Sequence, residues 1–160
     1  MAQINSSIRA LSIAGPFARL IAEGSKEIEL RSWLTSYRGL VLLHSSSGRG
    51  YEGYFDSLGI SKHECPKSAF IGAAFLTGCI SYNLPYFWYR DLKRHCWMGD
   101  EPYAVVRYYY YKDKPPIGHI FKRPILFEKP ILDVPGAFNY WRPQNYKQQL
   151  AFNRALKLIP

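Results

Sequence analysis

The sequence is poor in cysteine and has no paired cysteine motif. Its three cysteines are Cys65, Cys79 and Cys96, an odd number, and none forms a CxxC pair. This pattern favours free thiols in a reducing compartment over a disulfide framework, so we predict a cytoplasmic location.

Metal-ligand spacing is also lacking. The pairs His63/Cys65 and His95/Cys96 are too tight and too poorly matched for the two paired half-sites of a structural zinc site. We therefore predict no metal and no other cofactor.

No long apolar run is present. No stretch approaches the roughly 18 apolar residues that a membrane helix needs, so we expect no membrane association. Residues 1–10 lack the continuous apolar segment of a signal peptide. Without repeats or linkers, a chain of 160 residues that is 48% hydrophobic is expected to fold as one domain over residues 1–160.

Acidic residues are scarce relative to basic ones. The 21 Lys and Arg outnumber the 12 Asp and Glu, which gives a net charge of +9. A basic balance favours polyanionic partners. Aromatic residues make up 16% of the chain, including 13 Tyr and 4 Trp. Although most rings are expected in the core, rings beside cations also stack on bases, so we expect RNA or another nucleic acid as the partner.

Hydrophobic periodicity predicts a small α+β barrel of five to six strands. Alternating or continuous apolar residues predict strands, and a spacing of three to four predicts helices. The predicted strands are 10–13, 26–33, 40–43, 69–80, 103–111 and 123–128, with the last barrel residues in 136–142. The predicted helices are 16–24, 51–58 and 143–159, and residues 81–100 are expected to form a long loop or lid.

The segment Gly24–Trp33 resembles the ASCH signature GxKxxExRxW. Ahead of it, residues 10–18 are similar to the opening of that family, and Tyr37-Arg38-Gly39 with residues 43–46 are similar to the segment that follows. Weaker similarity continues through Cys65-Pro66, Ile71-Gly72, Trp97 and residues 103–106. The sequence is thus identified as similar to ASCH domains of the PUA-like superfamily from about residue 9 to 111, and loosely to Trp141.

This resemblance implies a PUA-like barrel with a ligand cleft beside the first helix and a second helix at the C-terminal end. Relatives in the superfamily bind RNA or modified bases, and a few ASCH proteins are nucleases or amidohydrolases on acetylated cytidine. The amidohydrolases carry a Thr nucleophile three residues after the motif Lys. Glu29 occupies that place here, which argues against that reaction.

The charged residues Lys26, Glu29 and Arg31 are the centre of the predicted site. On one strand, Glu29 and Arg31 share a face, whereas Lys26 reaches it only from a loop after Gly24. Arg31 can fork onto a phosphate or base edge, Lys26 can neutralise a phosphate, and Glu29 can accept from an exocyclic amine. The alternative is an exterior ion-pair cluster, which stabilises by only ~0–1 kcal/mol.

Further ligand contacts are predicted around this centre, at Pro16, Trp33, His44, Ser45 and Ser46. A second group mixes cations with a ring and is expected to contact a nucleic-acid backbone: Arg49, Arg90, Lys93, Arg94 and Trp97.

Two functions remain open from the sequence. The first is a nucleic-acid-binding module that acts as a monomer or weak homodimer. The alternative is a nuclease or a hydrolase of a modified nucleoside, with Lys26, Glu29, Tyr37 and His44 as candidate catalytic residues. An adaptor that contacts only protein is a third possibility.

Overall fold

The computed structural model describes residues 8–48 and 50–160. Two sequence predictions concern the other positions. Most of the segment predicted not to be a signal peptide lies outside the described residues, and so does Arg49, a predicted backbone contact.

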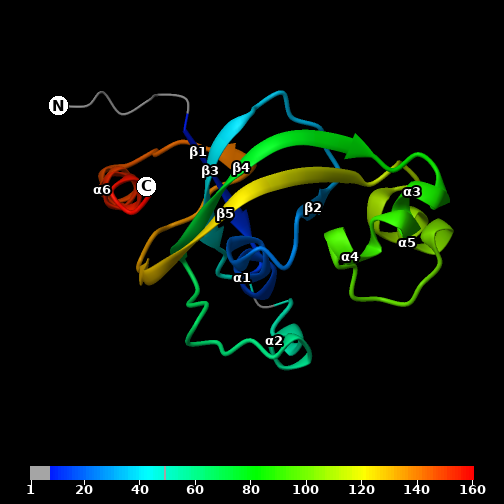
Figure 1. The fold of residues 1–160 in the computed structure, drawn as a ribbon, viewed down its shortest axis with the longest axis horizontal. Coiled ribbons are helices and arrows are strands. Elements are labelled where there is room, and N and C mark those ends of the chain that lie inside the picture. The colour runs from blue at the N-terminus through cyan, green and yellow to red at the C-terminus, as the bar shows by residue number, and fades with distance from the viewer. Residues whose placement is uncertain (1–7, 49) are drawn as a thin grey trace.

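One six-stranded sheet in the described residues curls into a half-barrel (Figure 1). Its order is β2-β5-β4-β3-β1-β6, with β1 parallel to β3 and all other neighbours antiparallel. The strands are β1 (Arg9–Ile13), β2 (Ile28–Arg31), β3 (Gly39–Ser45), β4 (Ala69–Ser81), β5 (Ile117–Ile131) and β6 (Tyr140–Trp141). This architecture confirms the predicted α+β class and the upper value of five to six strands.

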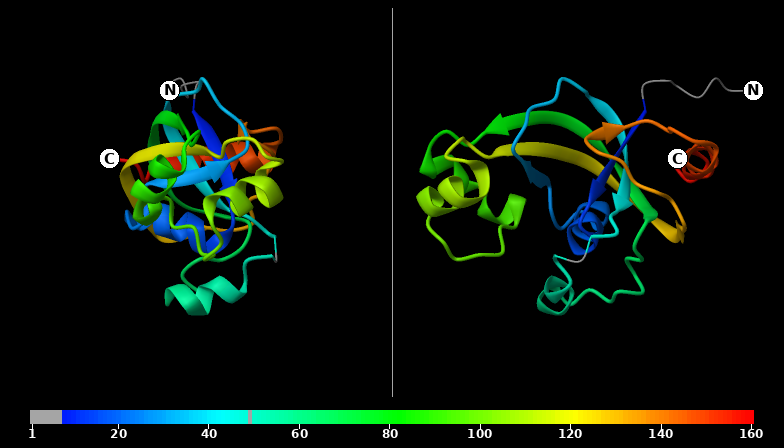
Figure 2. Two further views of the ribbon diagram at one scale, coloured as in Figure 1. Left: turned by 90° about the vertical axis from the view of Figure 1, so that its right-hand side faces the viewer. Right: turned by 180° about the vertical axis from the view of Figure 1, so that it is seen from behind.

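The helices are α1 (Gly15–Glu23), α2 (Gly53–Leu58), α3 (Pro85–Arg90), α4 (Leu92–His95), α5 (Tyr103–Tyr111) and α6 (Tyr146–Leu156). Figure 2 shows α1 in the hollow of the sheet, α3 to α5 gathered at one end of the long strands β4 and β5, and α6 at the opposite end. Within the part of the chain that the structure describes, no helix is long and apolar enough to cross a membrane.

Strand alternation explains why both faces of the sheet are covered, since successive side chains point to opposite faces. Leu11 and Val41 pack with Ile21 of α1 in one core cluster. Their neighbours Ala10 and Leu42 pack with Phe152 of α6 in another.

Two sequence predictions at the α3–α5 end are wrong. Residues 81–100 were expected to be a loop, but α3 and α4 lie within them. Residues 103–111 were expected to be a strand, but they form α5. Tyr103 and Val106 are three residues apart, and this helical spacing buries both against Tyr82 and Trp88. The strand preference of tyrosine is mainly a preference for a suitable packing surface, and here the surface favours a helix.

The other predicted elements are present with shifted ends. The strand expected at 123–128 is the middle of β5, which begins six residues earlier at Ile117. The helices expected at 16–24, 51–58 and 143–159 correspond to α1, α2 and α6.

Candidate ligand-binding site

A cavity of 580 Å³ opens where the ends of β1 and β2 meet the segment after α4 and the end of α5. Lys26, Glu29 and Arg31 all line it. The structure therefore brings the three charged residues to one concave site, and they do not form a set of exterior ion pairs.

Lys26 reaches this cavity from the loop between α1 and β2. Gly24 ends α1 with a φ of 89°, a conformation that glycine adopts without strain, and the Lys26 N–H then donates to the Leu20 carbonyl. The Lys26 side chain is 3% exposed. Its Nζ donates to the His95 carbonyl and lies 5.6 Å from the centre of the Phe17 ring.

Glu29 is the charge partner of Lys26. The distance from Glu29 Oε1 to Lys26 Nζ is 3.8 Å, and the same oxygen accepts from the Leu30 N–H at 3.2 Å. Burial lowers the pKa of the Lys26 ammonium, and the Glu29 carboxylate opposes that shift. Among the described residues, Glu29 Oε2 makes no hydrogen bond. That oxygen is thus available to a ligand N–H.

Arg31 differs from Lys26 because no carboxylate of the described residues pairs with its guanidinium. Its Nη2 donates to the Ser12 carbonyl at 2.9 Å, and within the described residues it makes no ion pair. A guanidinium in this position can fork onto an anion or onto a base edge.

Aromatic rings form the remaining walls of the cavity. Phe17 lies 5.6 Å from Tyr51 and 5.8 Å from Tyr54, measured between ring centres. On the other side Trp97 and Tyr110 are 5.1 Å apart, and both donate to the Glu101 carboxylate. Glu101 also lines the cavity, so its described charges are two cations and two carboxylates.

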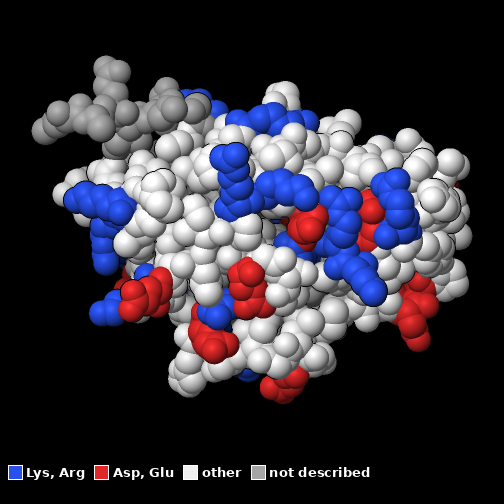
Figure 3. Space-filling view, in the orientation of Figure 1, with Lys and Arg blue, Asp and Glu red and all other residues white. Residues whose placement is uncertain are grey.

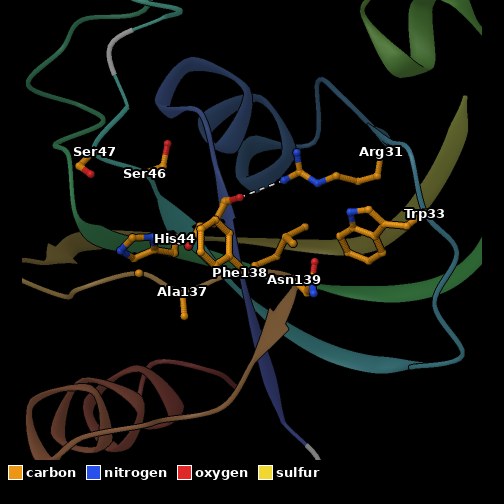
Figure 4. Close-up of a pocket in the computed structure, with 11 residues that line it drawn as sticks. Arg31, Trp33, His44, Ser46, Ser47, Ala137, Phe138 and Asn139 are labelled. Atoms are coloured by element: carbon orange, nitrogen blue, oxygen red, sulfur yellow. Dashed lines mark hydrogen bonds between the residues drawn. The ribbon is translucent and has the colours of Figure 1, made fainter. Parts of the chain in front are cut away.

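A second cavity of 480 Å³ adjoins the first and shares Ser12, Arg31, Trp33 and Ser46 with it. Figure 4 shows Arg31 and Trp33 on one side of it, the serines on the other, and Phe138 between them. A third cavity, of 710 Å³, shares Trp33 and Asn139 with the second.

His44 borders the second cavity, but both of its ring nitrogens are occupied. Its Nε2 donates to the Val134 carbonyl at 2.7 Å, which leaves Nδ1 to accept from Ser12 Oγ at 2.9 Å. Burial lowers the pKa of the imidazole. Gly136 covers this pair so closely that a Cβ there would lie 2.7 Å from both partners. These contacts occupy both ring nitrogens of His44, and its place among the candidate catalytic residues stays a prediction.

Ser45 and Pro16, two of the predicted ligand contacts, do not line these three cavities. Ser45 is fully buried, its Oγ lies 3.4 Å from Cys65 Sγ, and it lines none of the three cavities. Strand alternation turns it away from Ser46, which lines two of them. Pro16 is buried at the start of α1, and its neighbour Phe17 lines the cavity in its place.

Tyr37 lies in the third cavity, away from Lys26. It donates its hydroxyl to the Leu40 carbonyl at 2.6 Å, and the Arg9 guanidinium lies 5.2 Å from its ring centre. Burial raises the pKa of the Tyr37 hydroxyl. The four candidate catalytic residues are therefore divided among separate places, and only Lys26 and Glu29 face each other.

His119 holds Trp33 in place, and no pattern in the sequence pointed to it. His119 Nε2 donates to the Trp33 carbonyl at 2.8 Å, and Nδ1 accepts from the Tyr140 hydroxyl at 2.8 Å. Its ring also contacts the Trp33 ring, 4.9 Å away between centres. Only the pairing of β2 with β5, which sets His119 opposite Glu29, brings this residue to the site.

The arginines of α3 and α4 that were predicted to contact a nucleic-acid backbone form ion pairs with acidic side chains of this protein. Arg90 and Arg94 both pair with Asp91, at 3.1 and 3.4 Å, and Arg94 also pairs with Glu27 at 3.1 Å. Figure 3 shows blue and red side chains interspersed over this end of the molecule. Lys93 is exposed, and of the described members of the group (Arg90, Lys93, Arg94 and Trp97) only Trp97 lines the first cavity.

No group of three or more His, Cys, Asp or Glu in residues 8–48 and 50–160 is arranged to hold a metal ion. His95 Nε2 bonds to the Trp88 carbonyl at 3.0 Å, and the Cys65 thiol donates to the Gly15 carbonyl at 2.8 Å.

Comparisons with known proteins identify the family of the chain and a similar fold. The family model described as ASCH domain matches residues 11–123, more than two thirds of the chain. The solved structure of an ASCH protein from Zymomonas mobilis is similar, with a TM-score of 0.59, 13% identity, and coverage of 94% of this chain and 96% of that one. A single-residue variant of the same protein gives the same TM-score and identity over 92% and 97% of the two chains. No curated protein matches. With the family model covering this share of the sequence, the chain belongs to the ASCH domain family.

Proposed function

We propose that this ASCH domain is a nucleic-acid-binding module that holds a base of RNA, or of another nucleic acid, in the cavity of Lys26, Glu29 and Arg31. One observation carries the proposal. A carboxylate oxygen and a guanidinium, both available to a ligand, lie in one cavity whose other walls are aromatic rings.

The side chains suit the parts of a nucleotide. Glu29 Oε2 is a site for an exocyclic amine, and Arg31 is a site for a base edge or a phosphate. Lys26 is held by the His95 carbonyl and Glu29, so its role is to orient the carboxylate. The volume of 580 Å³ lies within the range of roughly 300–1,000 Å³ for small-molecule sites. Stacking on the rings contributes about 1–3 kcal/mol per base.

Fluorescence anisotropy with short labelled RNA and DNA tests the proposal. We expect Arg31→Ala to weaken binding about tenfold or more, because a charge-assisted contact of about 1–3 kcal/mol is lost. Arg154→Ala, which removes an exposed cation from α6 at the far end of the molecule, is the matched control and is expected to bind as the wild type does. Equal losses in the two variants, or no binding by the wild type, would reject the proposal.

A second candidate function is hydrolysis of RNA or of a modified nucleoside. The observation in its favour is the buried Lys26–Glu29 pair, since burial lowers the pKa of an amine that a carboxylate keeps in place. Incubation of the wild type and Lys26→Met with labelled RNA and with acylated nucleosides separates this function from binding alone. If the wild type yields no product from any substrate, only the binding module remains.

A further inference from the structure

Helix α5 has an exposed apolar stripe opposite its buried side. Of the nine residues in this helix only Arg107 is charged. Tyr103 and Val106 face the core of the α3–α5 end. The opposite side shows the one-turn spacing of a helix face and is exposed, at Ala104, Val105, Tyr108 and Tyr109. Because a helix that is apolar all round is normally covered on every side, this tyrosine stripe is a surface that a partner would cover.

The rings of the tyrosine stripe are wide open. Tyr108 and Tyr109 are 64% and 74% exposed, and their ring centres lie 5.1 Å apart. The half-exposed Tyr89 of α3 adjoins the first turn of α5, because its hydroxyl accepts from the Tyr103 N–H at 2.9 Å. Exposed tyrosines grouped in this way have the composition of the centre of a protein–protein interface.

The charge around the stripe is balanced, unlike that of the whole chain. Residues 99–114 contain three cations and three acids, which are Arg107, Lys112, Lys114, Asp100, Glu101 and Asp113. Arg107 and Asp113 also pair with each other at 3.5 Å. Since the whole chain carries a net charge of +9, two copies repel wherever basic surfaces meet. A region without net charge is where a second copy can approach.

A second group of exposed apolar side chains lies in a basic region. Phe138, Tyr146 and Leu150 are exposed, and they belong to residues 134–160. That segment contains four Lys and Arg and no Asp or Glu. Two copies joined there would set like charges against each other, which opposes association. Of the two apolar groups, the tyrosine stripe is therefore the one suited to self-association.

The exposed area of the rings matches a weak dimer. A tyrosine buries about 150–250 Å² when it is fully covered, so Tyr89, Tyr108 and Tyr109 together still expose about 300–450 Å². Stable interfaces bury about 800 Å² on each partner, and weak, transient ones bury less than about 600 Å². The three rings supply the centre of an interface of the weaker class, with Ala104 and Val105 beside them.

From this arrangement we infer that the chain forms a weak two-fold homodimer in which the tyrosine stripes of two α5 helices pack against each other. A two-fold axis brings the same patch of both copies together, so tyrosine rings pack on tyrosine rings and the balanced charges of the two rims meet. This association goes beyond the proposed function and does not depend on a bound nucleic acid.

Sedimentation equilibrium of the nuclease-treated full chain, from about 5 to 500 µM, tests the dimer. The average mass of the wild type is expected to rise from one chain toward two. Tyr109→Lys is expected to weaken association about tenfold or more, because it places an ammonium in the apolar centre of the interface. Val105→Lys, one turn earlier on the stripe, is the second variant. The matched control is Tyr146→Lys, which changes a 77% exposed tyrosine of α6 and should associate as the wild type does.

A wild type that stays monomeric at about 500 µM would overturn the dimer. So would association of Tyr109→Lys and Val105→Lys as strong as that of the wild type, or an equal loss in Tyr146→Lys. Salt provides a further readout, since screening of the repulsion between two chains of charge +9 is expected to strengthen the dimer. Association that weakens steeply with salt would show that residual nucleic acid bridges the copies, and it would also refute the tyrosine contact.

Discussion

Burial at Lys26 is tolerable only because the ammonium has two oxygen partners. A charge withdrawn from water loses several kcal/mol of hydration, which attraction offsets only where the geometry is good. The His95 carbonyl comes from the end of α4, and the Glu29 carboxylate comes from β2. The ion pair therefore connects the sheet to the helical end of the molecule, at the mouth of the proposed site.

Removing one member of this pair is expected to be costly. Glu29→Ala leaves a buried, unpaired ammonium, and we expect a loss of about 3–5 kcal/mol in the free energy of unfolding. Glu27→Ala is the matched control, because that carboxylate pairs on the surface with Arg94 and Lys122. Exposed ion pairs contribute only about 0–1 kcal/mol to the free energy of unfolding. Urea unfolding of the two variants measures the difference. Equal losses would show that the Lys26–Glu29 pair is not the buried contact described.

Three buried histidines give the stability a dependence on pH. Burial lowers the pKa of His44 and His119, and it lowers the pKa of His95 to about 4. In the unfolded chain each takes up a proton near pH 6.5. The folded state binds these protons less well than the unfolded chain does. The stability that the neutral rings contribute to the free energy of unfolding is therefore fully present above about pH 6.5, and it is lost as the pH falls below that value.

We therefore expect the free energy of unfolding, measured by urea titration, to fall between about pH 7 and pH 5, by at most about 1.4 kcal/mol per pH unit for each histidine. A midpoint that is constant over this interval would contradict the buried, neutral state of the three rings.

Local sequence patterns were sufficient for some residues of the site and not for others. Lys26, Glu29 and Arg31 lie within six residues, so one short motif specified them. Strand alternation separates Ser45 from Ser46, but an apolar run that ends in a polar loop does not say where the strand ends. His119 was missed because only the pairing of β2 with β5 brings it to the site.

Among the elements, α5 shows how packing overrides local preference. Its tyrosines favour strands in isolation, yet Tyr108, Tyr109 and Tyr110 remain exposed and only Tyr103 and Val106 are buried. The sequence predicted every strand of the central sheet except β5 in nearly its full extent, because those strands carry continuous or alternating apolar residues. It failed at α3 to α5, where the partner surface, Tyr82 and Trp88, is formed by the same unpatterned segment.

The stability of the α3–α5 end is expected to depend on Trp88, which lies in the core of that end and is 1% exposed. Trp88→Ala removes ring contacts with Tyr82, His95 and Tyr103 and is expected to cost about 3–5 kcal/mol. Hydrogen exchange should accelerate first in residues 82–111, with α6 still protected. Uniform acceleration over the whole chain would contradict a separately packed helical end.

For the whole molecule, the curl of the sheet creates the site from distant segments. Residues 12–14, 26–33, 95–101 and 110–111 meet at one cavity only because α3 to α5 fold back toward the hollow in which α1 lies. The net charge of +9 indicated an anionic partner. It could not show that the first cavity is lined by both signs of charge.

Salt is expected to weaken binding of a single strand by an amount set by the phosphates contacted. Each contact contributes about −0.7 to the slope of log K against log salt concentration. With one phosphate contact at Arg31, we expect a slope of about −0.7 or steeper. Titrations at several salt concentrations measure it, and a slope of zero would exclude the phosphate contacts.

The most direct measurement follows the four tryptophan indole N–H signals by NMR while a short RNA strand is added. Trp33 and Trp97 line the cavities, whereas Trp88 and Trp141 are buried in two other parts of the molecule. A base in the cavity of Lys26, Glu29 and Arg31 predicts that the Trp97 and Trp33 signals move and saturate together. Saturable binding that leaves Trp33 and Trp97 unmoved would contradict the account.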